Sequence, residues 1–389
     1  MRPSMAVILS IFPVFLITGC WNKFELTQWG FVQAVAIDPT EEGKIELTTH
    51  IYKPTGGGGE GGGPSPHEGI KFINVKTEAE TIHDAIRDIP IQLGRKAKFD
   101  HMRVIIVGEE LARKKNVAEI LDIFSRDHEP RATVSIMIAK GKASEYLDVK
   151  PLIESTMGQQ LRRIDETASR FSAKTIKTNL LDLALQLKSA GKVATVPYLD
   201  FGNTKPKTTP VAGIALLKKG KMVDLLSPTD AENLMILVNQ YKSGVIEIPC
   251  EKQGKEDKKS MESFEVRSVQ TKVTPRIKGN SLTVHVSAKI EGSTSELRCS
   301  SLLTKEQAKA FEEKIKKRVE QNLRKTIEFL QKEKVDAIGL GNKIYIKDPA
   351  LWESWKEKWD QHFAASRFEI DVDVKVANTG MNVGKPFGK

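Results

Sequence analysis

The feature that most constrains the fold is a long amphipathic segment late in the chain, from Thr304 to about Lys334. Its apolar residues lie three or four positions apart, as on one side of an α-helix. They are Ala308, Phe311, Ile315, Val319, Leu323, Ile327 and Leu330. At the usual rise per residue the helix is roughly 45 Å long, so its single apolar stripe has to lie along another layer. A coiled-coil partner is the alternative, although steps of four fit a 3.5-residue repeat poorly.

Strand-like runs at 244–249, 262–277 and 281–297 precede this helix and can supply that layer. Lys278-Gly279-Asn280 suits a tight turn between the last two runs. The pattern predicts an antiparallel sheet packed by one long helix. We assign residues 211–377 to this C-terminal domain, and the polar, glycine-rich and basic residues 378–389 to a flexible tail.

The first half of the chain alternates between strand and helix patterns, which predicts a small βαβαβ unit. Its expected elements are a strand at 70–76, a helix at 78–93, a strand at 103–108, a helix at 116–126 and a strand at 133–139. We expect this unit to be a subdomain, 70–139, inserted into an N-terminal domain made of 20–69 and 140–201. The predicted fold class is therefore α+β, with two to three domains.

Two segments between the predicted elements have the composition of loops. The glycine-rich residues 55–64 lack the Gly-Lys-Ser/Thr step of a phosphate-binding loop, so they predict a flexible insertion. Residues 202–210, Gly-Asn-Thr-Lys-Pro-Lys-Thr-Thr-Pro, have the composition of a linker, and we place the main domain boundary there.

The first twenty residues indicate where the protein is located. Arg2 is followed by an apolar run from Met5 to Ile17, which is shorter than the ~20 residues of a membrane-spanning helix. The run ends in Leu16-Ile17-Thr18-Gly19-Cys20, the pattern of a bacterial lipobox. We therefore predict a lipoprotein signal peptide at 1–19, cleaved so that Cys20 becomes an N-terminus carrying a diacylglycerol thioether.

Two alternatives remain for this segment: an uncleaved membrane anchor, or an ordinary secretory signal with an incidental cysteine. Acyl chains on Cys20 would hold the protein at the membrane, because each buried CH₂ contributes roughly 0.8 kcal/mol. No later stretch approaches ~18 uninterrupted apolar residues. A function at the membrane would therefore depend on the anchor and on partner proteins.

The chain is basic, with 60 Lys and Arg against 50 Asp and Glu, and most of the excess lies in residues 210–389. Such a surface suits anionic lipid headgroups or an acidic partner; a solvated surface without a specific ligand is the alternative. Nucleic acid is disfavoured, because the lysines around 252–259 and 314–317 are interleaved with Glu and Asp and lack neighbouring aromatic side chains.

Cys250 and Cys299 remain after Cys20 is assigned to the anchor, and each follows a strand-like run. A disulfide closing the loop between them would stabilise the fold by about 4 kcal/mol in the chain-entropy model. Two buried free thiols are the alternative. A metal site is disfavoured, because neither cysteine belongs to a CxxC pair or has a histidine at ligand spacing.

The sequence contains no HExxH, CxxC, Gly-x-Ser-x-Gly, Walker or EF-hand motif. We therefore assign no catalytic residue, metal or cofactor and expect that the protein is not an enzyme. Trp352, Trp355 and Trp359 share one side of a predicted helix. We interpret them as core packing, with a ligand platform or a membrane-contact face as alternatives.

The chain resembles the Ger(x)C family, the lipoprotein C subunits of nutrient germinant receptors in endospore-forming bacteria. The lipobox is followed by Trp21-Asn22-Lys23-Phe24-Glu25-Leu26 and by the strand from Gly30 to Asp38. Three further matching stretches are Phe99-Asp100-His101-Met102-Arg103-Val104-Ile105-Ile106-Val107-Gly108-Glu109-Glu110-Leu111, Gly244-Val245-Ile246-Glu247-Ile248-Pro249-Cys250, and Asp336-Ala337-Ile338-Gly339-Leu340-Gly341 followed by Trp352. The chain departs from the family pattern at the insertion 56–63, which lengthens a loop.

This resemblance implies multi-spanning A and B partner subunits in the spore inner membrane, where nutrients such as amino acids or sugars trigger germination. It also implies a three-domain body, lipidation of Cys20 and no catalytic residues. Export by the signal peptide places the lipid anchor on the outer face by default. Asp38, Asp100, Gly339 and Gly341 are motif positions that could serve turns and packing as well as contacts.

We expect the chain to act as a scaffold or coupling element that does not itself bind the germinant. The main alternative is a solute-binding lipoprotein that delivers a small molecule to a transporter, which would need a two-lobed cleft between parallel sheets. A cell-envelope hydrolase is a further alternative, and it would need a nucleophile or an acid/base pair that the motifs do not supply.

Overall fold

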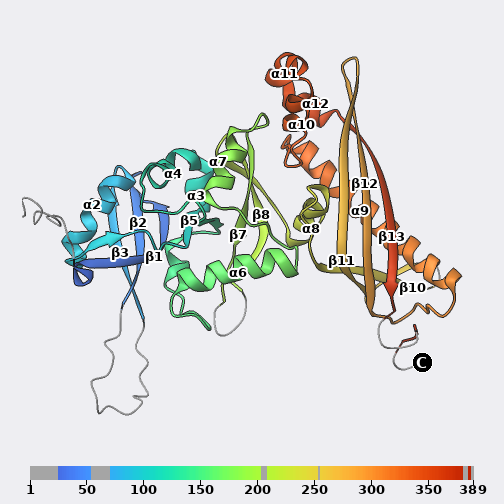
Figure 1. Cartoon of the computed structure of the whole chain (residues 1–389), viewed down its shortest axis with the longest axis horizontal. Helices are drawn as coiled ribbons and strands as arrows, with labels where there is room; N and C mark the ends of the chain where they lie inside the picture. The colour runs from blue at the N-terminus through green and yellow to red at the C-terminus, as the bar shows by residue number, and fades with distance from the viewer. Residues whose placement is uncertain (1–24, 54–70, 203–207, 253–254, 380–383, 387–389) are drawn as a thin grey trace, which may run out of the picture.

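A computed structural model describes residues 25–53, 71–202, 208–252, 255–379 and 384–386. Cys20 and the glycine-rich loop 55–64 lie outside these ranges. The chain folds into two domains, each built on its own sheet (Figure 1). The predicted α+β class with more than one domain is therefore confirmed, and the number of domains is two. None of the helices in the described ranges is both long and apolar enough to cross a bilayer.

The N-terminal domain is built on a nine-stranded sheet in the order β3-β2-β1-β5-β6-β7-β8-β9, with β4 paired to β1. Its central strands β1, β5, β6 and β7 run parallel, whereas both edges are antiparallel. The strands are β1 (Trp29–Pro39), β2 (Ile45–Tyr52), β3 (Phe72–Ala79), β4 (Lys96–Lys98), β5 (Val104–Gly108), β6 (Ser135–Ala139), β7 (Val193–Leu199), β8 (Val211–Lys218) and β9 (Lys221–Leu226). β5 and β6 are buried throughout, as expected for central parallel strands.

Helices cover both faces of this sheet. One core contains apolar residues of α2, α4 and α7, and a separate core on the opposite face contains those of α5 and α6. The helical segments of this domain are η1 (Leu26–Gln28), α2 (Ile82–Leu93), α3 (Glu109–Lys114), α4 (Val117–Arg126), α5 (Ser144–Leu147), α6 (Met157–Phe171) and α7 (Leu180–Lys188). The side chain of Asn116 accepts a hydrogen bond from the Ala118 backbone and so begins α4 where the sequence predicts it.

The predicted order of elements in 70–139 is present, but the prediction of an inserted subdomain is wrong. β3 pairs with β2 at the edge of the sheet, whereas β5 and β6 pair on the other side of β1. The crossover through α2 therefore passes over β2 and β1. Periodicity along the sequence identifies strands but not their neighbours, and the open edge of the β1–β2 hairpin is filled by β3.

Residues 211–226, which the sequence assigns to the C-terminal domain, extend the first sheet, because β8 pairs with β7. The predicted linker at 202–210 belongs to the hairpin between these strands. The Asp200 N–H donates to the Pro210 carbonyl and the Gly202 N–H to the Thr208 carbonyl, which brings the two ends of the loop together. A loop rich in Gly, Pro and Thr reads as a linker in sequence although it closes a hairpin.

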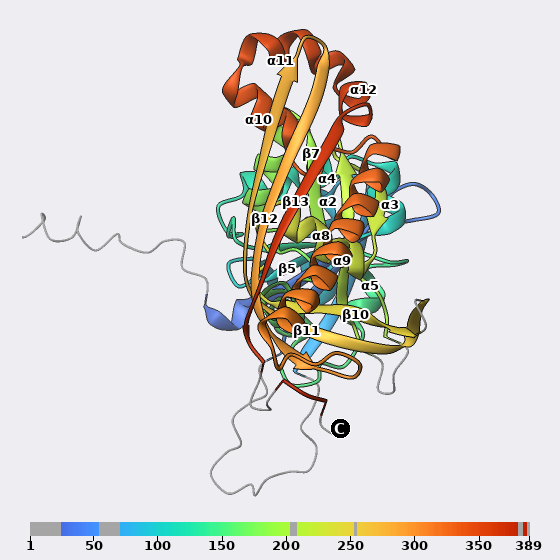
Figure 2. The same ribbon diagram turned by 90° about the vertical axis from the view of Figure 1, so that its right-hand side faces the viewer.

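The C-terminal domain consists of a four-stranded sheet, β10-β11-β12-β13, with α9 lying along one face (Figure 2). Its elements are α8 (Pro228–Leu237), β10 (Gly244–Lys252), β11 (Lys255–Lys278), β12 (Ser281–Glu296), α9 (Lys305–Lys332), α10 (Leu340–Lys347), α11 (Pro349–Trp355), η2 (Lys356–Lys358), α12 (Trp359–Ala364) and β13 (Arg367–Asn378). Thr304 caps α9 with a capping box, and the predicted apolar stripe from Phe311 to Leu330 is buried against the sheet.

Two expectations for this domain need correction. The sheet is mixed, because β13 runs parallel to β12. The long α9 returns the chain to the end of the sheet where β12 begins, and β13 then starts from that end. The tail is not loose throughout, because the Gly384 carbonyl accepts a hydrogen bond of 2.7 Å from the Leu302 backbone. The three tryptophans Trp352, Trp355 and Trp359 are buried, as core packing predicts.

The two domains share a continuous contact through β8. Ile214 and Leu216 belong to the core of the C-terminal domain, whereas Ala215 and Leu217 belong to the core around α2, α4 and α7. Alternate side chains of one strand point to opposite faces, so β8 serves both cores. Lys218, at the end of β8, adds an ion pair of 2.6 Å to Asp360 in α12.

Candidate functional site

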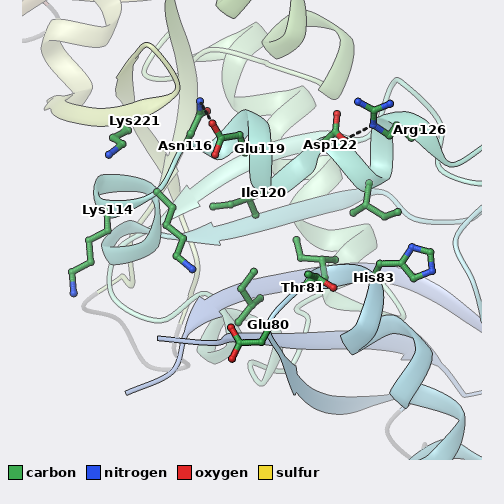
Figure 3. A pocket seen from close by; sticks show the side chains of 14 residues that line it. Glu80, Thr81, His83, Lys114, Asn116, Glu119, Ile120, Asp122, Arg126 and Lys221 are labelled. Atoms are coloured by element: carbon green, nitrogen blue, oxygen red, sulfur yellow. Dashed lines mark hydrogen bonds and ion pairs between the residues drawn. The ribbon is translucent and has the colours of Figure 1, made fainter. Parts of the chain in front are cut away.

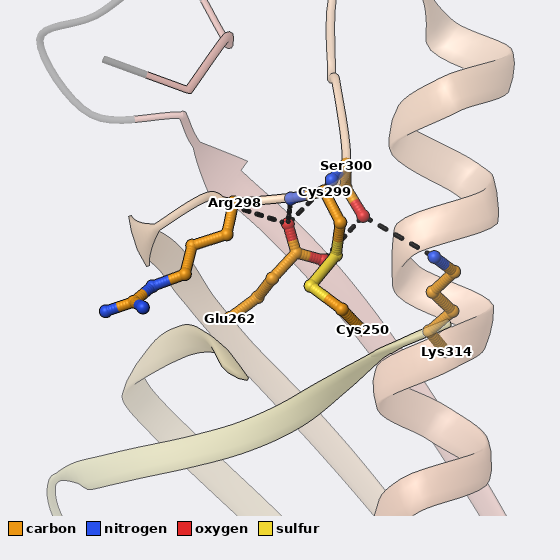
Figure 4. Close-up of a disulfide and its surroundings, with 6 residues drawn as sticks. All are labelled: Cys250, Glu262, Arg298, Cys299, Ser300 and Lys314. Carbon is orange, nitrogen blue, oxygen red and sulfur yellow. Dashed lines mark hydrogen bonds between the residues drawn. A yellow bond between two sulfur atoms is a disulfide. The ribbon is translucent and has the colours of Figure 1, made fainter. Parts of the chain in front are cut away.

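The disulfide region lies where β10, β11 and the segment leading into α9 meet (Figure 4). The structure joins Cys250 to Cys299 in a disulfide with a Cα–Cα distance of 6.0 Å. Cys250 is buried and Cys299 is exposed. The bond ties the end of β10 to the turn between β12 and α9.

A buried carboxylate beside the disulfide holds the same turn. Oε1 of Glu262 accepts hydrogen bonds from the backbone N–H groups of Arg298, Cys299 and Ser300 at 3.0, 3.0 and 2.7 Å. Its Oε2 accepts one from the Ser300 hydroxyl at 2.6 Å. Burial raises the pKa of Glu262, but these hydrogen bonds outweigh burial and hold the pKa below its usual range. Glu262 therefore stays ionised and fixes the turn.

Cys250, Glu262 and Cys299 are also the one group of at least three possible metal-ligating side chains found among the described residues. The two sulfur atoms are bonded to each other, so neither is available as a thiolate ligand. The group therefore does not fit a metal, and we assign it a structural role.

The carboxyl edge of the parallel strands is where open α/β sheets usually bind ligands. Here Asp38, at the end of β1, is 1% exposed and accepts hydrogen bonds from the Ala143 and Ser144 backbone at 2.7 and 2.8 Å. Burial raises the pKa of Asp38 despite these bonds. A Cβ on Gly108 would lie 2.3 Å from Asp38 Oδ1, so β5 also closes tightly on this carboxylate. The segment leading into α5 therefore covers this edge.

The other motif positions also form turns. Asp336 is buried and accepts hydrogen bonds from the Leu340 and Gly341 backbone at 2.9 and 2.7 Å, which caps α10. Gly339 has a φ of 78°, a conformation that glycine adopts at little cost. Asp100 lies near Lys98 and His101 at the opposite, amino edge of the parallel strands. The hydrogen bonds of Asp336 and the backbone conformation of Gly339 are explained by the turn that begins α10 and need no ligand.

A buried histidine was not singled out by the sequence patterns. Nε2 of His50 accepts a hydrogen bond from the Met157 backbone at 3.2 Å, so Nδ1 carries the proton and donates to Asn74 Oδ1 at 2.6 Å. Burial lowers the pKa of His50 to about 4, so the ring is neutral at physiological pH. Both ring nitrogens are occupied, and the side chain joins β2, β3 and α6.

An open groove of about 670 Å³ lies between α2 and α4 (Figure 3). Isoleucines form its apolar part: Ile45, Ile82, Ile120 and Ile123. Side chains of both charges line its rim, among them Glu80, Lys114 and Arg126, the last paired with Asp122. An apolar floor with a charged rim resembles a protein contact surface more than an enclosed small-molecule site.

A smaller cavity of about 300 Å³ lies between the end of α6 and the elements α8, β10 and α9. Burial raises the pKa of Glu232, which lines it, to about 7, and Lys174 lies 3.9 Å from this carboxylate. Tyr241 is 4% exposed, and its hydroxyl has no hydrogen-bond partner among the described residues. This cavity has the polar groups that a small ligand would need.

Comparisons with known proteins agree over nearly the whole chain. The profile of the spore germination protein N-terminal domain matches residues 22–201, and that of the spore germination B3/GerAC-like C-terminal domain matches 212–380. Spore germination protein KC of Bacillus subtilis (strain 168) is 26% identical over 394 residues, which cover 96% of this chain and 94% of the relative. Spore germination protein B3 of the same organism is 26% identical over 99% of this chain and 100% of its own length.

The crystal structure of the GerBC protein has a similar fold, with a TM-score of 0.54 at 24% identity; the match covers 88% of this chain and 97% of that one. The two family profiles together account for both domains described above. The chain therefore belongs to the Ger(x)C family of spore germination proteins, the C subunits of germinant receptors.

Proposed function

We propose that this protein is a lipid-anchored scaffold of a nutrient germinant receptor, held on the outer face of the spore inner membrane through Cys20. It stabilises and couples the multi-spanning A and B subunits. The observation that carries the proposal is the match of two germination-protein domains across nearly the whole chain. The lipobox pattern before Cys20 supplies the anchor.

The groove between α2 and α4 is the surface that we assign to a partner subunit. The groove opens to solvent, where Ile123 is half-buried, and its rim carries both charges, as protein interfaces do. The covered carboxyl edge argues against a ligand cleft at the usual place in a parallel sheet, because Asp38 holds the segment over it. No catalytic role is proposed.

Deletion of the chain in spores tests the scaffold directly. The expected result is loss of the germination response together with reduced amounts of the A and B subunits in the inner membrane. Normal amounts of both subunits, with normal germination, would contradict the proposal. Ile123→Glu places a charge on the groove floor, and we expect it to reduce co-purification of the other subunits. Ile346→Glu, which alters an apolar residue that is 72% exposed in the other domain, is the matched control.

The cavity lined by Glu232 favours a second candidate, a small-molecule-binding lipoprotein. This function would require saturable, stereospecific binding of a nutrient by the isolated chain, measured by calorimetry. Loss of that binding in Glu232→Gln would place the ligand in the cavity. Absence of saturable binding in the wild-type chain is the result that the scaffold proposal predicts.

A further inference from the structure

A second charged cavity, of about 160 Å³, lies at the amino edge of the parallel strands. Three arginines line it, and each comes from a different element: Arg103 directly precedes β5, Arg131 lies in the segment before β6, and Arg162 belongs to α6. The volume equals that of roughly five water molecules, enough for a tetrahedral oxyanion. Guanidinium groups match the oxygen geometry of phosphate.

Arg162 is held in place by its neighbours. Its Nε donates to Glu166 at 2.8 Å, and one terminal nitrogen donates to the Thr133 carbonyl and the Ser135 hydroxyl, each at 2.8 Å. The buried Asp165 in turn accepts a hydrogen bond from the Ser135 hydroxyl at 2.7 Å. One wall of the cavity is therefore oriented before any ligand arrives.

Arg103 and Arg131 remain exposed, and no carboxylate in the described ranges forms an ion pair with either of them. Nε of Arg103 makes one long hydrogen bond, 3.4 Å, to Gln33. The one carboxylate lining the cavity, Asp100, lies 3.8 Å from both Lys98 and His101. Among the side chains lining the cavity, three guanidinium groups therefore face a single carboxylate, which already lies near the ammonium group of Lys98. Arg162 is paired with Glu166, so the two exposed arginines supply the free positive charge.

The cavity lies beside the start of β1, the strand that follows the proposed anchor. Trp29 is in register with Lys96 of β4, and Phe31 is in register with Lys98. The Phe31 ring packs edge-on against His101, with 5.5 Å between centroids. At most about 30 Å of extended chain separates Cys20 from Trp29, so acylation of Cys20 would keep this edge near the bilayer.

The cationic surface continues from the cavity to Trp29. The ammonium groups of Lys96 and Lys98 lie 5.1 and 4.9 Å from the centroid of the Trp29 ring. Tryptophan beside basic side chains is typical of surfaces that meet lipid headgroups. Arg95, which is exposed, adds a further positive charge next to Lys96.

We propose that this edge faces the membrane and that the cavity among Arg103, Arg131 and Arg162 binds the phosphodiester of an anionic phospholipid headgroup. The proposal rests on the proposed lipid anchor for its geometry. The headgroup contact would orient the tethered domain, because an acyl anchor alone leaves the body free to rotate about its tether.

Vesicle co-sedimentation tests this site without the anchor. The mature chain carrying Cys20→Ala has no acyl chain, and its binding is compared on phosphatidylcholine vesicles with and without phosphatidylglycerol. We expect binding only when phosphatidylglycerol is present, and a loss of roughly fivefold in partitioning for each arginine removed. Arg103→Gln/Arg131→Gln should therefore bind roughly 25-fold more weakly. Arg131→Gln alone, at an exposed residue, guards against misfolding of the double variant.

Lys272→Gln/Arg276→Gln is the matched control, because it removes two exposed charges from β11 in the other domain. An equal loss of vesicle partitioning in this control would overturn the proposed headgroup site, because general charge attraction would then explain the binding. Binding of inorganic phosphate without binding to phosphatidylglycerol vesicles would overturn the lipid source. No binding of the starting chain to either would overturn the proposal. Membrane retention of the acylated chain in spores reports on the anchor separately, so failure of one proposal is distinguishable from failure of the other.

Discussion

Replacement of Glu262 by alanine should destabilise the C-terminal domain by about 4 kcal/mol. The side chain is 0% exposed and accepts four hydrogen bonds, three from backbone N–H groups and one from the Ser300 hydroxyl. A buried donor left without a partner costs about 1–3 kcal/mol. We take the lower end for each of the four donors, because Arg298 and Cys299 are exposed and water can reach part of the turn.

Urea unfolding followed by tryptophan fluorescence measures this effect. Trp352, Trp355 and Trp359 are all buried in the C-terminal domain, so their emission reports on its transition. Glu265→Ala, three residues along the same strand and exposed, is the control and should change stability by no more than about 0.5 kcal/mol. A change below about 1 kcal/mol for Glu262→Ala would refute the argument that this carboxylate holds the turn.

Glu262→Gln separates the charge from the hydrogen bonds. The hydrogen bonds hold the pKa of Glu262 below its usual range, so its ionised form stabilises the fold above the unfolded pKa of about 4.3. That stabilisation is lost as the pH falls through the lower pKa of the folded state. The advantage of the wild-type chain over Glu262→Gln should therefore narrow below about pH 4, and an advantage that stays constant there would contradict this reasoning.

Further perturbations test other parts of the fold. Gly108→Ala should destabilise the N-terminal domain by about 1–3 kcal/mol in thermal unfolding, because its Cβ would lie 2.3 Å from Asp38 Oδ1; an unchanged midpoint would contradict this packing. Burial raises the pKa of Asp165 to about 6, so its contribution to stability is greatest below the unfolded pKa of about 4 and is lost as the pH rises through 6. Asp165→Asn should reduce this loss in urea titrations, and an identical pH profile would refute it. Reduction of the Cys250–Cys299 bond should lower the stability of the C-terminal domain by about 4 kcal/mol in urea; an unchanged midpoint with and without reductant would count against a closed bond.

Patterns along the sequence predicted the C-terminal architecture well because one element dominates it. A stripe of seven apolar residues predicts a single long helix, and Thr304 marks its start. The parallel pairing of β13 escaped prediction because strand periodicity is the same in parallel and antiparallel sheets. The direction of β13 is decided by α9, which is long enough to return the chain to the end of the sheet where β12 begins.

The N-terminal half shows why neighbours are harder to predict than elements. The strands around 70–139 were recognised individually, yet β3 and β5 lie on opposite sides of the β1–β2 hairpin. The two faces of β8 are buried in different cores. The sheet to which β8 belongs is therefore decided by its pairing with β7 and not by its composition.

The charged groups that shape the candidate sites were the least predictable. Glu262 and Asp165 are buried carboxylates whose partners are distant in sequence, and no spacing rule connects them. Arg103 and Arg131 converge because the amino ends of the parallel strands β5 and β6 meet at one edge, and Arg162 reaches the same cavity from α6. The motif around Asp100 and Arg103 was recognised in the sequence, but its two companion arginines lie outside it.

We propose above that the protein is a receptor subunit tethered to the membrane through Cys20. The most direct test is Cys20→Ala in spores, with inner-membrane content and the germination response to a panel of nutrients measured in the same preparation. We expect that both the inner-membrane content and the germination response are lost while the protein is still produced. Full retention in the membrane with normal germination would contradict it.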